Sequence, residues 1–248
     1  MDMTKVKTLA KWIEESQASV FFGGAGVSTE SGIPDFRSKT GIYSKHIGAE
    51  SILTPRFMLH EAKEFWSFYR TYLMPKDPQP NACHYGLAEL EKAGLLKAVI
   101  TQNIDGLHQA AGSKNVLELH GNGQHFYCVK CGKESPLETV VEGDLIPLCP
   151  YCHGQLRPDI VLYEEALDFH VMESAAAFIA AADLIIIGGT SLTVYPAAGL
   201  LYERKRNSRL VLINKDATFQ DDAADILIRD PIGEVFKALM PLLNLPEK

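Results

Sequence analysis

Four of the five cysteines form two pairs with the spacing of a metal site. Cys128 and Cys131 make one C-x-x-C pair, Cys149 and Cys152 make the second, and 17 residues separate the two pairs. Two residues between thiolates let one turn present both sulfurs to a single ion, and two such turns complete a tetrahedron. We therefore predict one structural zinc ion per chain, in a four-thiolate site that is closed to water and substrate.

Unrelated reduced thiols are the alternative explanation for these cysteines. His125 and His153 lie nearby and could compete as ligands, but four thiols in register make them unnecessary, so we expect surface histidines. The fifth cysteine, Cys83, stands alone on a predicted helix, where we expect a buried thiol. Metal-binding cysteines are typical of a reducing compartment. The N-terminal stretch reads as an amphipathic helix without a targeting signal, and we expect a cytoplasmic protein.

A glycine-rich segment follows the first predicted strand. It reads Gly24-Ala25-Gly26, and glycines in this position allow backbone N–H groups to approach a pyrophosphate. The strict G-x-G-x-x-G pattern fails, because Thr29 occupies the third glycine position. No acid follows at the end of a second strand, where a dehydrogenase binds its ribose. The loop indicates a dinucleotide site, and a merely tight strand–helix turn is the alternative.

Further polar residues lie where they could cover or attack a bound ligand. A proline-containing loop carries Phe36 and Arg37, and Asn103 and Asp105 directly follow another predicted strand. His120 precedes a glycine just outside the sheet and is a candidate general base. Each of these residues could instead have a purely structural role. Asn103 can cap a turn, and His120 can fill a buried polar position.

Composition limits the classes of partner. The chain has 248 residues, 46% of them hydrophobic, which is enough for one large domain with a smaller one. Its formal net charge is −7, which argues against nucleic acid, because phosphate backbones are bound by basic surfaces. The longest apolar runs are too short to span a membrane. An acidic surface is compatible with basic peptide partners, although solubility alone explains it as well.

Strands that alternate with helices must position these residues. We predict buried parallel strands at 19–22, 98–101, 184–187, 210–213 and 226–228, and helices at 4–16, 81–93, 168–181, 195–206 and 232–243, with Asn81 and Asp168 as N-caps. This pattern predicts an α/β, Rossmann-like, doubly wound sheet with ligands beyond the carboxyl ends of its strands. The NAD-binding domain would comprise 1–34, 78–120 and 164–248, while a helical insertion at 35–77 and a zinc module at 121–163 form a small domain.

The motifs together resemble those of the sirtuins, a family of NAD-dependent protein-lysine deacylases, and they are most similar to those of its bacterial members. The matching segments are Gly24-Ala25-Gly26-Val27-Ser28, Gly32-Ile33-Pro34-Asp35-Phe36-Arg37, Thr101-Gln102-Asn103-Ile104-Asp105, His120-Gly121, both cysteine pairs, Gly189-Thr190-Ser191-Leu192 and Pro196-Ala197-Ala198. The resemblance implies that NAD is a consumed co-substrate. The acyl oxygen of an acyl-lysine attacks the ribose carbon that carries nicotinamide, and the products are lysine, nicotinamide and O-acyl-ADP-ribose.

The resemblance also implies a role for each site residue. His120 is the implied base on a ribose hydroxyl, Asn103 positions water or ribose, Phe36 shields the reacting ribose, and Arg37 contacts phosphate. The other implied NAD contacts are Ala25, Gly26 and Thr29 along the phosphates and ribose, Gln102 at ribose hydroxyls, Ile104 and Asp105 at the carboxamide, Thr190 and Ser191 at phosphate or ribose, Asn214 at the adenosine ribose, and Asp230 and Ile232 at the adenine.

An acyl-lysine peptide is expected to add as a strand between two loops, one formed by Val161, Leu162, Tyr163 and Glu164 and the other following Ser191. Many sirtuins have glycine where this chain has Glu164, which either favours basic peptide flanks or points into solvent. Relatives that remove acidic acyl groups carry Tyr-x-x-Arg in the helical insertion. This chain reads Tyr69-Arg70-Thr71-Tyr72 there, so we expect a neutral acyl group such as acetyl.

Two other functions remain open at this level. A mono-ADP-ribosyltransferase would also consume NAD, but an intact Asn103 and His120 favour deacylation. A zinc module on a nucleotide-sensing scaffold without catalysis is the other. The sequence supports a dehydrogenase less than either of these two functions. We expect a monomer that binds NAD and acetylated lysine of protein substrates, with no nucleic acid or membrane among its partners.

Overall fold

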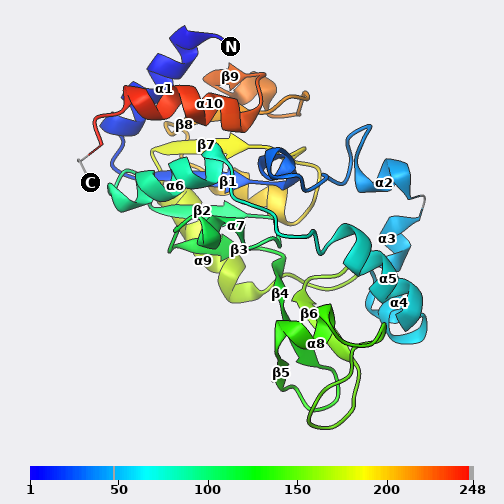
Figure 1. The fold of residues 1–248 in the computed structure, drawn as a ribbon. Coiled ribbons are helices and arrows are strands. Elements are labelled where there is room, and N and C mark those ends of the chain that lie inside the picture. The colour runs from blue at the N-terminus through cyan, green and yellow to red at the C-terminus, as the bar shows by residue number, and fades with distance from the viewer. Residues whose placement is uncertain (47, 246–248) are drawn as a thin grey trace.

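A six-stranded parallel sheet lies at the centre of the larger lobe in the computed structural model, which describes residues 1–46 and 48–245 (Figure 1). Its spatial order is β3-β2-β1-β7-β8-β9, so strands from the two halves of the chain meet where β1 lies beside β7. The strands are β1 (Ser19–Gly23), β2 (Ala98–Thr101), β3 (Val116–Glu118), β7 (Leu184–Gly188), β8 (Arg209–Ile213) and β9 (Ile226–Ile228). This order confirms the predicted doubly wound, Rossmann-like sheet.

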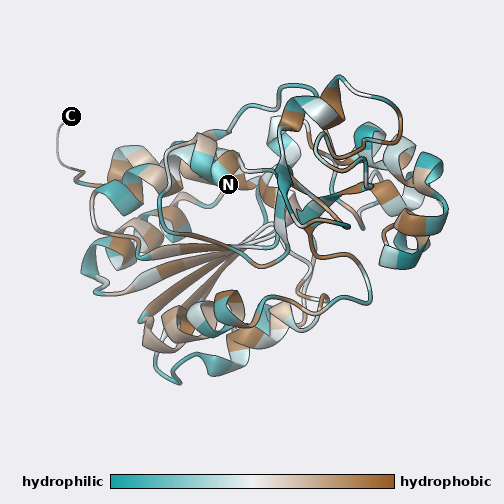
Figure 2. Cartoon of the chain, turned by 90° about the horizontal axis from the view of Figure 1, so that it is seen from below, coloured by the Kyte–Doolittle hydropathy of each residue, from teal (hydrophilic) through white to brown (hydrophobic). Residues whose placement is uncertain are grey.

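Helices cover both faces of this sheet. One face packs against α1 (Met3–Glu15), α6 (Ala82–Lys92) and α10 (Ile232–Leu239), and the other against α9 (Phe169–Ala181) and the 3₁₀ segment Ala197–Glu203. Figure 2 shows the apolar strands between these two layers. Phe21 faces the first layer, and its neighbours Val20 and Phe22 face the second. Burial on both faces explains why the strands read as continuous apolar runs.

The predicted helix caps are present. The Asn81 side chain accepts a hydrogen bond from the Cys83 N–H at 2.9 Å, and the Asp168 side chain accepts one from the Val171 N–H at 2.9 Å. Asn81 also donates through Nδ2 to the Val27 carbonyl at 2.8 Å, which fixes α6 against the glycine loop. Cys83 is buried, as predicted. Among the described residues, no helix combines the length and the apolar character that crossing a membrane requires.

The two insertions form one smaller lobe. Its antiparallel sheet has the order β5-β4-β6. The elements are β4 (Gly121–Cys128), β5 (Glu134–Ser135), α8 (Leu137–Val141) and β6 (Leu156–Ile160), with α2 (Ile42–Lys45), α3 (Ala49–Ile52), α4 (Pro55–His60) and α5 (Ala62–Tyr72) from the helical insertion. The Trp66 and Phe126 rings lie 6.1 Å apart, and the Tyr69 hydroxyl donates to the Gly123 carbonyl at 3.2 Å. Shared packing of this kind makes one core from two distant segments.

Two predicted helices differ in the structure, and one strand of the parallel sheet was not predicted. The helix predicted at 195–206 was wrong, because this stretch forms the 3₁₀ segment Ala197–Glu203, where Gly199 lowers α-helix propensity. The predicted helix at 232–243 ends at Leu239, because Pro241 lacks the N–H that a continuing helix needs. The third difference is the strand β3, which was not predicted. It has only three residues, too few to show a period. Short α7 (Leu107–Ala110) and four further 3₁₀ turns complete the described elements.

Candidate active site

A cavity of about 730 Å³ opens beyond the carboxyl ends of the parallel strands, against the smaller lobe. This is the position in which doubly wound sheets bind their ligands. Every residue predicted to contact NAD or peptide lines it: Ala25, Gly26, Thr29, Phe36, Arg37, Gln102, Asn103, Ile104, Asp105, His120, Val161, Leu162, Tyr163, Glu164, Thr190, Ser191, Asn214, Asp230 and Ile232. The fold therefore brings these distant segments together around one space.

The glycine loop is held against the loop that follows β7. The Gly24 N–H donates to the Gly188 carbonyl at 3.1 Å, and the Gly26 N–H donates to the Gly189 carbonyl at 2.8 Å. A Cβ atom at Gly26 would lie 2.7 Å from the Gly189 Cα, a backbone atom that cannot rotate away. The glycines are thus required because two backbones touch where the two halves of the sheet meet.

Gly26→Ala is expected to destabilise the protein and to weaken NAD binding. The added methyl group must push apart the loops after β1 and β7, and overpacking of this kind costs about 1–3 kcal/mol. For a chain of this size, we expect a fall in melting temperature of roughly 2–10 °C. Thermal denaturation with and without NAD measures both effects. Gly199→Ala is the matched control, because its nearest contact lies at an ordinary 3.7 Å. Equal melting curves and NAD shifts in the two variants would contradict the prediction.

Asn103 is fixed by a buried hydrogen-bond chain. Its Nδ2 donates to the Ser28 hydroxyl at 3.0 Å, and that hydroxyl donates to the Asp105 carboxylate at 2.6 Å. The second Asp105 oxygen accepts from the Leu107 N–H at 2.9 Å. Ser28 and Asn103 are buried. The Asn103 amide is therefore held in one orientation, as positioning of a reacting group requires. Ser28 has a part in the site that the sequence alone did not indicate.

His120 has the geometry of a general base. Its Nδ1 lies 2.8 Å from the Gln102 carbonyl oxygen. Because a carbonyl only accepts, Nδ1 carries the proton in this hydrogen bond, and Nε2 of the neutral ring is the basic nitrogen. Burial lowers the pKa of His120 below its ordinary value, and the Arg37 charge lowers it further. The ring therefore stays neutral, and able to accept a proton, near neutral pH.

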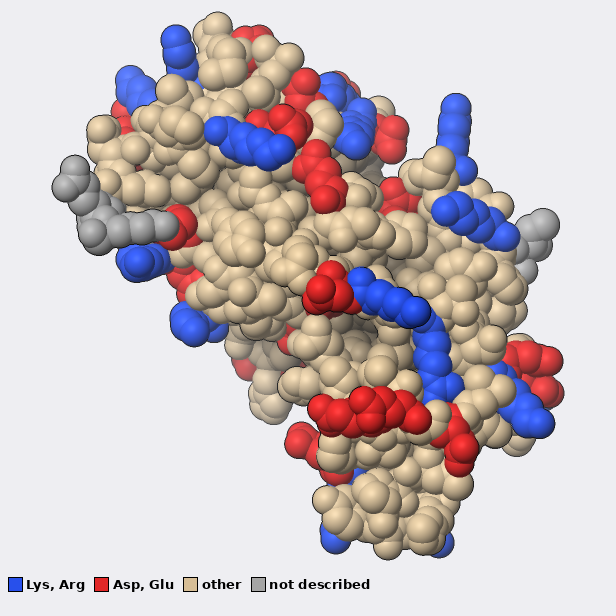
Figure 3. Space-filling model, in the orientation of Figure 1, with Lys and Arg blue, Asp and Glu red and all other residues tan. Residues whose placement is uncertain are grey.

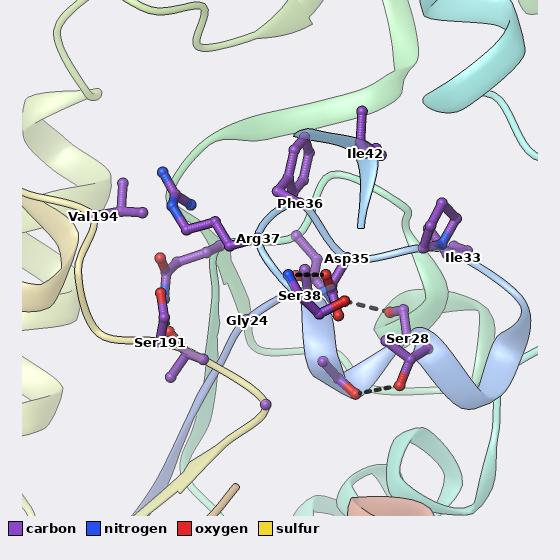
Figure 4. Close-up of a pocket in the computed structure, with 18 of the residues that line it drawn as sticks. Gly24, Ser28, Ile33, Asp35, Phe36, Arg37, Ser38, Ile42, Ser191 and Val194 are labelled. Carbon is purple, nitrogen blue, oxygen red and sulfur yellow. Dashed lines mark hydrogen bonds between the residues drawn. The ribbon is translucent and has the colours of Figure 1, made fainter. Parts of the chain in front are cut away.

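The segment after the glycine loop forms a turn over the cavity. The Asp35 side chain accepts from the Ser38 N–H at 2.9 Å, and the Phe36 carbonyl accepts from the Tyr43 N–H at 3.0 Å. Figure 4 shows Phe36 and Arg37 leaving this turn in different directions, with Arg37 extending toward the side where Ser191 and Val194 lie. The turn thus presents an aromatic ring and a cation to the same space.

The predicted peptide strand has a rigid support. Arg157 donates to both oxygens of Glu165, at 2.7 and 2.8 Å, and Glu165 accepts from the Leu162 N–H at 2.9 Å. The Val161 N–H donates to the His120 carbonyl at 2.9 Å. The predicted peptide strand and His120 are therefore linked through the backbone. Arg157 was not predicted as part of this support, because nothing in its spacing from Glu165 indicates a pair.

Glu164 adopts a left-handed backbone conformation, with φ of 73°. Glycine is the residue that takes this conformation at the lowest cost. Glu164 therefore occupies a position whose backbone conformation favours glycine. In this chain, the side chain of Glu164 is exposed at the wall of the cavity.

The part of the cavity beside Asn214 contains lining residues that were not predicted. Asn214 donates through Nδ2 to the Asp216 carbonyl at 2.9 Å, and Arg229 donates to the Asn214 carbonyl at 3.1 Å. Lys215, Asp216 and Ala217 line the cavity beside Asn214. Their position at the carboxyl end of β8 is the signal that could have identified them.

The four cysteines of the two C-x-x-C pairs form one cluster. Their sulfurs lie within 4.8 Å of one another, with Cys128 and Cys152 at 3.5 Å and Cys131 and Cys149 at 3.7 Å. Zn–S bonds of about 2.3 Å in a tetrahedron place sulfurs roughly 3.8 Å apart. The donor set therefore fits one zinc ion and leaves no open position. His125 and His153 are exposed and outside the cluster, as expected.

Two buried histidines, His84 and His108, lie behind the site. Their rings are 4.8 Å apart, and within the described chain His84 Nε2 and both nitrogens of His108 lack a hydrogen-bond partner. Burial lowers the pKa of His84 to about 4 and that of His108 to about 3, the latter also through the charge of His84. Both imidazoles are therefore neutral in the folded protein.

This pair is expected to make the protein sensitive to acid. Below pH 6.5 these histidines become protonated in the unfolded chain but stay neutral in the folded chain. The free energy of unfolding therefore has its full value above pH 6.5 and decreases as the pH falls toward 4. The free energy of unfolding decreases by about 1.4 kcal/mol per pH unit for each histidine. Urea unfolding at pH 7.5 and 5 measures it. His108→Phe should reduce the loss, and His170→Gln, at an exposed histidine, should leave it unchanged. An equal loss in all three proteins would contradict this account.

Known proteins match this chain over most of its length. The Sir2 family model matches residues 24–196. An NAD-dependent protein deacetylase of Clostridium acetobutylicum is 49% identical over 243 residues, 96% of this chain and 99% of the relative. One of Cutibacterium acnes is 49% identical over 235 residues, 93% of this chain and 96% of the relative. A solved structure of Sir2 with a p53 peptide and NAD⁺ has a TM-score of 0.86 at 39% identity and covers 97% of this chain and 98% of its own. The chain belongs to the Sir2 family.

Proposed function

We propose that this protein is an NAD-dependent protein-lysine deacetylase. It transfers the acyl group of an acyl-lysine to ADP-ribose, with release of nicotinamide and O-acetyl-ADP-ribose. The observation that carries the proposal is the shared cavity, which is lined by His120, the glycine loop and the 161–164 segment, while the Nδ1 of His120 is bound to the Gln102 carbonyl. The names of the relatives, and Sir2 structures with NAD⁺ or with a propionylated peptide, support it.

Each residue of the cavity has its own role in the proposed reaction. NAD supplies the ribose carbon that the acyl oxygen attacks. His120 accepts a proton at Nε2 from a ribose hydroxyl, and a positioned base of this kind contributes about 10²–10⁴-fold. Asn103, held by Ser28, orients ribose or water. Phe36 excludes bulk water from the reacting ribose, and Arg37 compensates phosphate charge.

The other contacts belong to the same proposal. Ala25, Gly26, Thr29, Gln102, Thr190 and Ser191 bind phosphate and ribose oxygens, Ile104 and Asp105 hold the carboxamide, Asn214 binds the adenosine ribose, and Asp230 and Ile232 border the adenine. The peptide pairs with Val161, Leu162, Tyr163 and Glu164 as an added strand. We also propose the domain division at 1–34, 78–120 and 164–248 against 35–77 and 121–163, with this cavity between the two domains.

The acyl group is proposed to be neutral. Arg70 donates hydrogen bonds to the carbonyls of Val140, Asp144 and Leu145, at distances between 2.7 and 3.0 Å. Its guanidinium is therefore bound to the backbone of the smaller lobe. Tyr72 and Leu73, by contrast, line the cavity. An acidic acyl group would therefore lose its hydration without gaining a partner from Arg70.

Acetyl-lysine peptide is expected to exceed the matching succinyl-lysine peptide in kcat/KM by about 100-fold or more, since an unpaired charge is costly to desolvate. Deacylation of both peptides, followed by mass spectrometry, measures the ratio. Propionyl-lysine is the control, because it adds volume without charge. Comparable rates for acetyl and succinyl peptides would contradict a neutral acyl site.

The proposal extends to the cellular setting of the enzyme. We propose that the enzyme is cytoplasmic, which the four zinc-binding thiolates support because such sites are typical of reducing compartments. We also propose that it is a monomer. Positive and negative side chains are interspersed on the face seen in Figure 3, in contrast to the basic stripe that a phosphate backbone requires.

Labelling with NAD that carries a tag on its adenosine tests the reaction class. A deacetylase leaves the tag on a small product, O-acetyl-ADP-ribose. Stable tagging of protein without deacetylated peptide would instead indicate ADP-ribosyl transfer. NAD binding by calorimetry without turnover on acetylated peptides would indicate a non-catalytic scaffold. Either result would overturn the proposal.

A further inference from the structure

Two tyrosines join the cofactor side of the cavity to its peptide side. The hydroxyls of Tyr43 and Tyr163 form a hydrogen bond, although the residues are 120 positions apart in the sequence. Both side chains are half-buried, and both line the cavity. Tyr43 belongs to α2 in the helical insertion, and Tyr163 follows β6 in the proposed peptide strand.

On the cofactor side, Tyr43 supports the turn that carries Phe36 and Arg37. Its ring centroid lies 5.5 Å from that of Phe36, and the Arg37 guanidinium lies over it at 5.4 Å. The Tyr43 N–H donates to the Phe36 carbonyl at 3.0 Å. The Tyr43 ring therefore lies under both side chains proposed to cover NAD, and a shift of this ring would change their positions.

On the peptide side, Tyr163 is anchored by its backbone. Its N–H donates to the Leu53 carbonyl at 2.9 Å. The neighbouring Leu162 N–H is bound by Glu165, which Arg157 holds with two hydrogen bonds. A peptide that pairs with this strand would therefore hold Tyr163 in place. The Tyr163 hydroxyl, in turn, is hydrogen-bonded to the Tyr43 hydroxyl.

The Tyr43 phenol is suited to a lasting hydrogen bond. Burial raises the pKa of Tyr43 well above its ordinary value, and the neighbouring Tyr163 hydroxyl raises it further. Tyr43 is therefore neutral throughout the pH range in which the enzyme would be assayed, and it remains a hydrogen-bond partner for Tyr163.

We propose that Tyr43 and Tyr163 are positioning residues that couple the two substrates: an acyl-lysine peptide on the 161–164 strand fixes Tyr163, and Tyr163 fixes Phe36 and Arg37 over NAD through Tyr43. The inference rests on the proposed function. Such coupling is reciprocal, so the peptide raises the affinity for the ADP-ribose part of NAD, and this part raises the affinity for peptide by the same factor.

Calorimetry with ADP-ribose, which lacks the bond that reacts, tests the coupling without turnover. The measured quantity is the dissociation constant of ADP-ribose without acetyl-lysine peptide divided by that with it. Tyr43→Phe and Tyr163→Phe remove the hydrogen bond and keep both rings. Each should lower this ratio by about 3- to 10-fold, as loss of one hydrogen bond predicts. The double variant should lower it no further, because both single changes break the same bond.

Tyr85→Phe is the matched control and should keep the wild-type ratio, because Tyr85 is half-exposed on α6, outside the cavity. A purely structural role for the pair would change affinity for ADP-ribose equally with and without peptide. A wild-type ratio of one, unchanged ratios in the single variants, or additive losses in the double variant would overturn the inference. Nicotinamide release by the wild-type preparation tests the proposed function separately, so an active enzyme with uncoupled sites would refute only the coupling.

Discussion

His120→Ala is expected to lower kcat/KM for NAD-dependent deacetylation by about 10²–10⁴-fold. The change removes Nε2, the basic nitrogen that is defined by the hydrogen bond from Nδ1 to the Gln102 carbonyl. Peptide-dependent release of nicotinamide and O-acetyl-ADP-ribose, followed by chromatography, measures the loss. Binding of ADP-ribose should persist, because the glycine loop and the adenosine side are untouched.

His125→Ala is the matched control for this experiment. His125 lies on β4, the same strand that follows His120, but it is exposed and does not line the cavity. We expect this variant to keep wild-type turnover. Equal activity in the two variants would exclude His120 as the base, and so would a His120→Ala enzyme that retains full kcat/KM.

Removing the metal is expected to abolish activity by unfolding the smaller lobe. Structural zinc contributes on the order of 10 kcal/mol to the domain that binds it. Cys128 and Cys149 are part of the core that joins the cysteine module to the helical insertion. Loss of this core would release the 161–164 segment and the turn that carries Phe36, although neither touches the sulfurs. Hydrogen exchange of the chelated protein should show lost protection across residues 121–160 and 35–72, with the parallel sheet retained.

Cys149→Ser should reproduce the effect of chelation, with less than one zinc ion per chain by elemental analysis. Cys83→Ser is the control, because Cys83 is buried in the core of the larger domain, far from the cluster. That variant should keep its zinc while losing some stability. A chelated protein that stayed folded and active would show that the four thiolates are dispensable.

The parts of the fold that were predicted correctly share a physical cause. The strands buried on both faces leave long apolar runs, and the caps Asn81 and Asp168 precede their helices as capping residues do. The cysteine pairs were predictable because ligand spacing is local. The position of the cavity was predictable because parallel strands direct their carboxyl ends, and the loops that follow them, to one edge of the sheet.

The features that were missed depend on contacts between distant segments. Nothing in the sequence places Arg157 against Glu165, Tyr43 against Tyr163, or His84 against His108. Each pair is fixed by tertiary packing, and no spacing rule describes it. The strand β3 was missed for another reason, since its three residues include a charged Glu118 and show no periodicity. Glu164 shows most clearly what sequence-based prediction misses, because its left-handed backbone conformation is visible only in the structure.

The central claim is that NAD is consumed only together with an acyl-lysine. Mass spectrometry of the products formed from NAD and an acetyl-lysine peptide tests it most directly. We expect equal amounts of deacetylated peptide, nicotinamide and O-acetyl-ADP-ribose, and no nicotinamide when the peptide carries unmodified lysine. Nicotinamide formed at the same rate without acetyl-lysine, or deacetylation that yields free acetate without NAD, would contradict it.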